Sequence, residues 1–291
     1  MIFWSIVVLF VAILFFGVDV LVRRMYAYES PSPSKTPADY GIPYEKVRIP
    51  APRGGSLAGW WIPGEEGAPT LILVHGWSRN AQRMMPYIRA LHPLGYNLLA
   101  FDARNHGDSS PYPRPTVYSF AEDALSAVHF VQGEKPQAAR QLGIIGLSIG
   151  GGGAVNAAAM DGNIACVVAV GAVAHPIWTM LPEFRKRGIP EGIARALFKF
   201  MEWRYGLNFE RIAPVNNIAS ARAHFLLIHG EEDKTIPLEH GKRMYAAAPA
   251  GQAELWVVPG KGHSNCHTHP DFWPRVTAFL EAHCASSPAG R

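Results

Sequence analysis

The sequence predicts an α/β fold with a mostly parallel sheet and helices on both faces. From residue 69 onward, short continuous apolar runs typical of buried strands alternate with segments that have helical periodicity. Helical segments of about 10 to 15 residues between such strands indicate βαβ units. The 291 residues, with 48% hydrophobic and 17% charged side chains, are enough for one large domain and exclude a disordered chain.

The folded domain is expected over residues 44–285. It opens with two antiparallel strands within residues 44–64, because β-branched and aromatic side chains flank a turn at residues 53–55. The buried strands that follow are expected at residues 69–76, 96–107, 141–148, 164–172, 224–230 and 253–260. The helices between and after them are expected at residues 81–95, 117–132, 149–160, 241–248 and 273–284.

About fifty residues between Ala172 and Ala223 break this alternation. A structureless loop of that length is uncommon inside a domain, so we expect a helical cap insertion over about residues 173–222. Its large apolar side chains are expected to form a small core of their own, with an apolar pocket or a membrane contact as alternatives: Trp178, Met180, Phe184, Phe198, Phe200, Met201, Trp203, Tyr205 and Phe209.

Residues 1–22 carry one charge, Asp19, and are long enough as a helix to cross a bilayer. Basic residues ahead of the apolar run and a small-residue cleavage site, both typical of a signal peptide, are missing. The segment therefore predicts an uncleaved transmembrane anchor, with a buried helix as the alternative. Arg23 and Arg24 place the rest of the chain on the cytoplasmic side. The Pro- and Ser-rich residues 23–43 are expected to form an extended linker.

The charge and the cysteines of the chain limit the kinds of partner and of cysteine chemistry that are expected. The net charge is +4, but the basic residues are scattered, so a nucleic-acid partner is not expected. The three cysteines, Cys166, Cys266 and Cys284, lack metal-binding spacing. They are expected to be unpaired thiols, with a Cys266–Cys284 disulfide as the alternative. The oligomeric state stays open.

The stretch Gly146-Leu147-Ser148-Ile149-Gly150 predicts a nucleophilic serine. Where a buried strand turns sharply into a helix, the residue at the turn is strained and its side chain is held clear of the sheet. Glycines on both sides remove side chains that would collide there. Small residues that merely pack a helix on a sheet are the alternative, but the strand before and the helix after Ser148 favour catalysis.

A serine hydroxyl needs a base beside it and an acid to orient the base. His263 follows a buried strand in a glycine-rich loop and is the expected base, with His267 and His269 as less favoured candidates. Asp233 follows the preceding strand and is the expected acid. Glu231 and Glu232 are its rivals in the same turn. The order Ser, Asp, His at successive strand ends supports this assignment.

Two backbone N–H groups are expected to form the oxyanion hole, those of Ile149 and Trp77. Ile149 directly follows the nucleophile, and Trp77 lies in the loop after an earlier strand. Asp102, which also follows a strand, is a rival nucleophile of the kind found in dehalogenases. Because Ser148 fills that role, the loop at residues 101–109 is interpreted as a hydrogen-bonded structural turn.

Residues 45–283 resemble the serine-type α/β-hydrolase family, in its esterase, lipase and serine-aminopeptidase-like branch. The resemblance rests on HGWS at 75–78, DARNHGDS at 102–109, GLSIGG at 146–151, GEEDKTIP at 230–237 and GKGHS at 260–264. It implies an eight-stranded sheet with an insertion after the sixth strand. With the anchor, it suggests a membrane-anchored member of bacterial type. The sequence departs from many relatives at Ile149, where only the N–H is needed.

The expected function is hydrolysis of small-molecule carboxylic esters by Ser148, His263 and Asp233 through an acyl-enzyme. No cofactor is expected, and a metal site of His263, His267 and His269 is disfavoured. A peptidase or an acyltransferase could use the same three residues, and a binding protein without turnover is a further alternative. The natural substrate and its acyl-chain length stay open.

Overall fold

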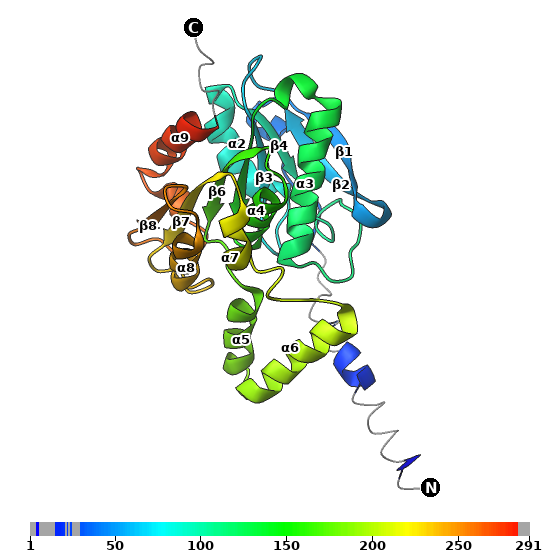
Figure 1. Ribbon diagram of the computed structural model, residues 1–291. Coiled ribbons are helices and arrows are strands. Elements are labelled where there is room, and N and C mark those ends of the chain that lie inside the picture. The colour runs from blue at the N-terminus through cyan, green and yellow to red at the C-terminus, as the bar shows by residue number, and fades with distance from the viewer. Residues whose placement is uncertain (1–3, 6–14, 21, 23, 25–29, 285–291) are drawn as a thin grey trace.

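The eight-stranded sheet runs through the centre of the protein in a computed structural model, which describes residues 4–5, 15–20, 22, 24 and 30–284 (Figure 1). The strand order is β1-β2-β4-β3-β5-β6-β7-β8. Only the β1–β2 and β2–β4 pairs are antiparallel, and the other neighbours are parallel. The strands are β1 Glu45–Ala51, β2 Gly55–Ile62, β3 Thr70–Val74, β4 Asn97–Phe101, β5 Leu142–Leu147, β6 Ile164–Val170, β7 His224–Gly230 and β8 Ala253–Val258.

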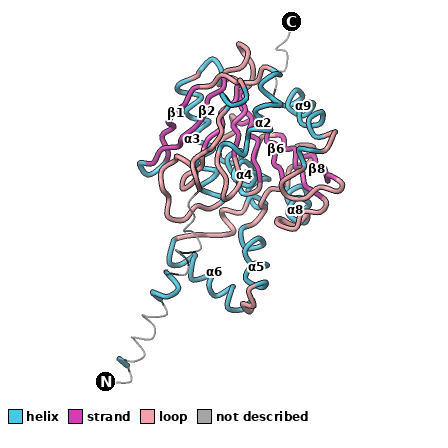
Figure 2. Tube along the Cα trace, turned by 180° about the vertical axis from the view of Figure 1, so that it is seen from behind, coloured by secondary structure: helices cyan, strands magenta, loops and turns pink. Residues whose placement is uncertain are grey.

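Helices cover both faces of the sheet (Figures 1 and 2). Side chains of α3, α4 and α8 pack in one buried cluster with one face, and side chains of α2 and α9 pack in a second cluster with the other. The helices are α2 Met85–Leu91, α3 Val117–Glu134, α4 Ile149–Met160, α5 Pro176–Lys186, α6 Glu191–Tyr205, α7 Pro214–Asn217, α8 Glu239–Ala247 and α9 Phe272–His283. The predicted mostly parallel sheet between two helical layers is confirmed.

Local sequence explains where the elements turn. Arg53 and Gly54 adopt left-handed conformations between β1 and β2, as a tight strand connection requires. The helix expected at residues 81–95 is divided into the 3-10 turn Ala81–Met84, α2 and the 3-10 turn His92–Leu94, and it ends at Gly95 with φ 82°. Proline at the start of α2 and of the last turn explains the division, because proline suits a first turn but not a helix interior.

The segment between β6 and β7 contains α5, α6 and α7, and α5 and α6 project from the end of the sheet where β5 and β6 finish (Figure 1). Its aromatic rings pack on one another: Phe184 lies 5.5 Å from Phe198, and Phe198 lies 5.8 Å from Phe209, between ring centroids. These rings belong to a separate buried cluster that also includes Val117 of α3. The insertion therefore has a small core of its own, although Trp203 is largely exposed.

The prediction of a membrane anchor at residues 1–22, and of a cytoplasm-facing membrane protein, is wrong. None of the helices in the described part of the chain has the length and apolar character needed to cross a bilayer. Residues 1–3, 6–14 and 21 of that segment lie outside the described residues. Its described end contacts α6 instead: the Tyr205 hydroxyl donates to Asp19 Oδ1 at 2.8 Å, and the Phe15 ring lies 5.5 Å from Phe200.

The expected linker, where the structure describes it, lies against the domain. The Ser30 hydroxyl donates to the Arg79 carbonyl, and the Asn80 amide donates to the Pro31 carbonyl. The Ser34 backbone N–H donates to Gln82. Residues 30–34 therefore fix the loop after β3 from outside.

The cysteine prediction is also wrong. Cys166 of β6 and Cys284, directly after α9, form a disulfide, and only Cys266 is free among the cysteines. Sequence spacing gave no sign of this pair, because 118 positions separate the two residues. They meet because α9 packs on the face of the sheet to which the Cys166 side chain points. The disulfide therefore links the C-terminal helix to a central strand.

Candidate active site

Ser148 lies at the turn between β5 and α4 with φ 57° and ψ −121°, a conformation that costs free energy for a non-glycine residue. The flanking glycines make the turn possible. A Cβ atom on Gly146 would lie 2.4 Å from the Gly150 carbonyl oxygen, and one on Gly150 would lie 2.3 Å from the His75 carbonyl oxygen. The Ser148 side chain is half-buried and lines a cavity of about 290 Å³. The turn therefore brings the Ser148 side chain to the wall of this cavity.

His263 and Asp233 form a hydrogen-bonded pair at the same end of the sheet. His263 Nδ1 lies 2.7 Å from Asp233 Oδ2, and the His263 ring lines the Ser148 cavity. Asp233 Oδ1 accepts the N–H groups of Thr235 and Ile236, each at 2.9 Å. Burial raises the pKa of Asp233, but the hydrogen bond to His263 and these backbone donors outweigh burial and hold the pKa below its usual value. Asp233 is therefore an anion beside the imidazole.

Burial sets Asp233 apart from Glu231 and Glu232, and the contact with Asp233 sets His263 apart from His267 and His269. Glu231 and Glu232 are exposed, whereas the Asp233 side chain is fully buried against His263. His269 packs on Trp256, while His267 lines the cavity. Ser148 and His263 share the cavity without a direct hydrogen bond between these two described side chains. The distance between a catalytic serine and its base is often longer than a hydrogen bond until substrate binds.

The loop after β3 lies directly beside Ser148. A Cβ atom on Gly76 would lie 3.1 Å from Ser148 Cβ and 3.8 Å from its hydroxyl oxygen. Trp77 lines the cavity, and its ring stands edge-on to His106. Ile149 is the first residue of α4, so its N–H has no acceptor within the helix. Both predicted oxyanion donors therefore belong to segments that border the nucleophile.

His75, which the sequence analysis treated only as part of the loop, joins this loop to the one after β4. Its ring is fully buried, Nε2 accepts the Ala103 N–H at 2.9 Å, and Nδ1 lies 2.7 Å from the Gly76 carbonyl. A ring that accepts at Nε2 carries its proton on Nδ1 and donates to that carbonyl. Burial lowers the pKa of His75 to about 3, so the imidazole is neutral.

This buried imidazole predicts a loss of stability in acid. Its pKa is about 3 in the folded protein, against 6.5 ordinarily. Between these pH values the unfolded chain takes up a proton that folded His75 does not. The free energy of unfolding therefore falls as pH falls through this window, by up to about 1.4 kcal/mol per pH unit from this group. The free energy of unfolding is measured by urea titration at several pH values between 6.5 and 4. For His75→Gln, the plot of this free energy against pH should be less steep than for the parent by about this amount.

The control for this measurement is His129→Gln, at an exposed position of α3. It should retain the slope of the parent protein. An equally steep pH dependence in His75→Gln and the parent would contradict the assignment of the effect to His75.

A second buried histidine supports the Asp233 turn. His229 Nε2 lies 2.7 Å from the Ile236 carbonyl oxygen and 3.6 Å from Asp233 Oδ2, the oxygen that His263 contacts. Burial lowers the pKa of His229, which favours the neutral ring that donates to the carbonyl. The role of His229 was not predicted from the sequence. The sequence feature that could have indicated it is the position of His229 at the end of β7, four residues before Asp233.

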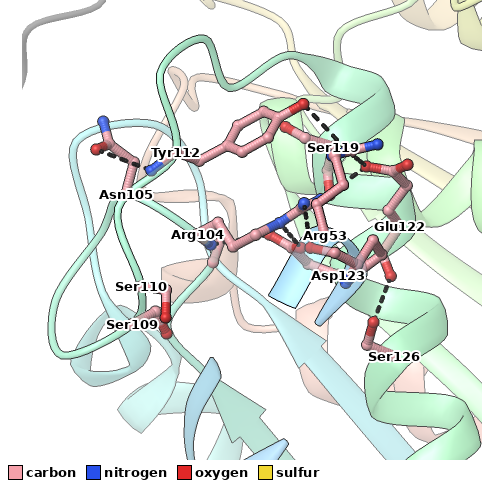
Figure 3. A network of polar contacts seen from close by, with 12 residues as sticks. Arg53, Arg104, Asn105, Ser109, Ser110, Tyr112, Ser119, Glu122, Asp123 and Ser126 are labelled. Carbon is pink, nitrogen blue, oxygen red and sulfur yellow. Dashed lines mark hydrogen bonds and ion pairs between the residues drawn. The ribbon is translucent and has the colours of Figure 1, made fainter. Parts of the chain in front are cut away.

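The loop after β4 has the structural role that the sequence predicts. Asp102 accepts the N–H of Ala81 at 2.6 Å and of Asp108 at 2.9 Å, and it does not line the Ser148 cavity. Burial raises the pKa of Asp102 to about 6. Arg104 fastens the same loop to α3: its guanidinium lies 2.5 Å from Asp123 and 2.7 Å from Glu122 (Figure 3). Asp102 therefore holds the loop and lies outside the Ser148 cavity.

The fold is that of an α/β hydrolase. The sequence profile described as the alpha/beta hydrolase family matches residues 71–273, and the chain belongs to that family. This confirms the family and the fold that the sequence motifs suggest, but the membrane-anchored bacterial type is not supported.

Relatives of the chain include proteins of different bacteria. The uncharacterised protein Rv2307c of Mycobacterium tuberculosis strain H37Rv is 27% identical over 84% of this chain and 80% of its own length. The uncharacterised protein YfhR of Escherichia coli K12 is 27% identical over 75% of this chain and 72% of its own length. Among solved structures, the esterase Pf2001 of Pyrococcus furiosus superposes with a TM-score of 0.72 and 26% identity, over 88% of this chain and all of that one.

Proposed function

We propose that this protein is a serine hydrolase that cleaves carboxylic esters through an acyl-enzyme intermediate. The observation that carries the proposal is the 2.7 Å contact between His263 Nδ1 and buried Asp233, in a cavity that Ser148 also lines. The similarity to an esterase of known structure adds support. A serine hydrolase needs a nucleophile, a base and an acid that orients the base. Residues of these types follow the carboxyl ends of β5, β7 and β8.

In the proposed mechanism, the Ser148 oxygen attacks the ester carbonyl while His263 Nε2 takes the hydroxyl proton. Asp233 keeps the other imidazole proton on Nδ1 and stabilises the imidazolium. The N–H groups of Ile149 and Trp77 donate to the oxyanion of the tetrahedral intermediate. His263 then protonates the leaving alcohol, and the acyl group stays on Ser148. Water, deprotonated by His263, releases the acid and restores the serine.

The cavity lining favours an ester over a peptide with a free amino terminus. A site for an ammonium group would need a carboxylate, yet none of the described residues that line this cavity is Asp or Glu. The peptidase alternative therefore lacks a group to bind the substrate amine. Transfer of the acyl group to an acceptor other than water would use the same steps and differs only in the second nucleophile.

Covalent labelling tests the proposal. A fluorophosphonate probe reacts with a serine only when a neighbouring base activates it. We expect the folded protein to be labelled at one site, which peptide mapping assigns to Ser148, and we expect labelling to disappear in Ser148→Ala. Folded protein that stays unlabelled would favour a binding protein without turnover and would reject the proposal.

A further inference from the structure

Two arginines line the cavity in which Ser148 and His263 lie. Arg79 belongs to the loop that begins at Gly76, and Arg83 belongs to the 3-10 turn Ala81–Met84. No aspartate or glutamate is among the described residues of the lining, so the wall of the cavity contains two arginines and no carboxylate. The space beside Ser148 is therefore electropositive.

Neither arginine has a carboxylate partner within 4.0 Å among the residues that the structure describes. In contrast, the arginines that support the fold do have such partners: Arg104 contacts Asp123 and Glu122, and Arg53 also contacts Glu122. Guanidinium groups in a partly enclosed space lose hydration and attract an anion to replace it. The two cavity arginines are thus available to a ligand.

Hydrogen bonds fix the backbone of Arg79 and the guanidinium of Arg83. The Arg79 carbonyl accepts the Ser30 hydroxyl at 3.1 Å, so the backbone of this exposed residue is fixed. Arg83 Nη2 donates to the Ser264 carbonyl at 2.8 Å, directly after His263. That bond uses one of the five N–H donors of the guanidinium, and the others remain for a ligand.

The remaining wall sets the size of the ligand. Apolar surface comes from Leu147, Val170 and Tyr87, and the volume of about 290 Å³ lies at the small end for ligand cavities. A long acyl chain exceeds this space. A short ester whose far end carries a charge fits both the volume and the wall.

Resting on the proposed esterase function, we propose that the cavity selects small esters that carry an anionic group, a carboxylate or a phosphate, which Arg79 and Arg83 bind. The planar guanidinium matches the two oxygens of either group and donates two parallel hydrogen bonds. The anion is not consumed. It holds the ester carbonyl near Ser148 while the hydrolysis proceeds.

Two pairs of esters test this selection, each with an anionic member and its methylated neutral match. The first pair carries a carboxylate on the acyl side: 4-nitrophenyl hydrogen glutarate and methyl 4-nitrophenyl glutarate. The second carries a phosphate on the alcohol side: 4-acetoxyphenyl phosphate and its dimethyl ester. The measured quantity is the ratio of kcat/KM for the anionic member to that for the neutral member. Comparing this ratio between variants cancels the intrinsic reactivity of each ester.

We expect Arg79→Gln to lower this ratio by about 10-fold in at least one pair, mainly through KM, because a charge-assisted hydrogen bond is lost. Arg79→Lys, which keeps the charge but not the fork, should lose less. Arg89→Gln is the matched control, since Arg89 is exposed on the neighbouring α2 and does not line the cavity. It should keep the parent ratio. Raising the salt from about 50 mM to about 500 mM should lower the ratio in the parent more than in Arg79→Gln.

The pair that responds identifies the anion and the side of the ester that carries it. If both Arg79→Gln and Arg83→Gln keep the parent ratio in both pairs, the selection is overturned while the esterase function stands, provided that turnover depends on Ser148. Folded protein that hydrolyses neither pair although the fluorophosphonate labels Ser148 overturns this selection alone, and folded protein that the probe leaves unlabelled overturns the esterase function and this selection with it.

Discussion

Replacing Ser148 with alanine is expected to lower kcat/KM for 4-nitrophenyl butyrate by about 10³-fold or more. The side chain supplies the only atom that would form the acyl-enzyme, and without it the base and the oxyanion donors act on water alone. Alanine keeps the Cβ atom, so the left-handed turn at φ 57° is no more strained than before. We therefore expect the melting temperature to change little, and the loss to be one of chemistry.

Steady-state kinetics together with thermal unfolding provide the measurement. Ser220→Ala, at an exposed position in the 3-10 turn Ile218–Ser220, is the matched control and should retain the parent rate. Hydrolysis at the parent rate by folded Ser148→Ala would show that another group is the nucleophile and would remove the basis of the proposed function.

Breaking the Cys166–Cys284 disulfide is expected to lower the free energy of unfolding by about 4 to 5 kcal/mol. The bond closes a loop with a sequence separation of 118, and loop closure restricts the unfolded chain by roughly this amount. The double variant Cys166→Ala, Cys284→Ala should therefore melt on the order of 10 °C lower than the oxidised parent. The measurement is urea and thermal unfolding of both proteins with and without a thiol reductant.

Cys266→Ala is the control, because Cys266 is the free cysteine of the described chain. The Cys266→Ala variant, even if the substitution itself lowers its stability, should still lose stability when the disulfide is reduced. The stability of the double variant should not change with reductant. Equal stability of the oxidised and reduced parent would contradict a structural role for the disulfide.

The candidate site illustrates how far local sequence can lead. The turn at Ser148 was predictable because glycine spacing indicates a backbone turn, and Asp233 and His263 were candidates because each lies in the loop after a buried strand. The roles of His75 and His229 were not predictable in this way. Each acts through a contact with another segment or with a carbonyl across a turn, and a single histidine in a sequence carries no mark of such a partner.

The N-terminal segment shows the opposite case. Its composition, apolar with the one charge of Asp19, favoured a bilayer over a protein surface. In the described residues, Asp19 is instead buried beside Tyr205 and Val22 is buried in the cluster of the insertion. Hydropathy reports how apolar a segment is, and it does not report what covers the segment.

The sequence by itself determined the alternation of strands and helices, the strained turn at Ser148 and the order of the residues expected to assist it, because these follow from periodicity and from short-range sterics. Only the tertiary structure decided that Cys166 meets Cys284, that His75 is a buried link between loops, and that Arg79 and Arg83 face the same cavity as Ser148. Those pairings depend on how distant segments pack, and the free energy of packing depends on the whole fold and not on any one stretch of chain.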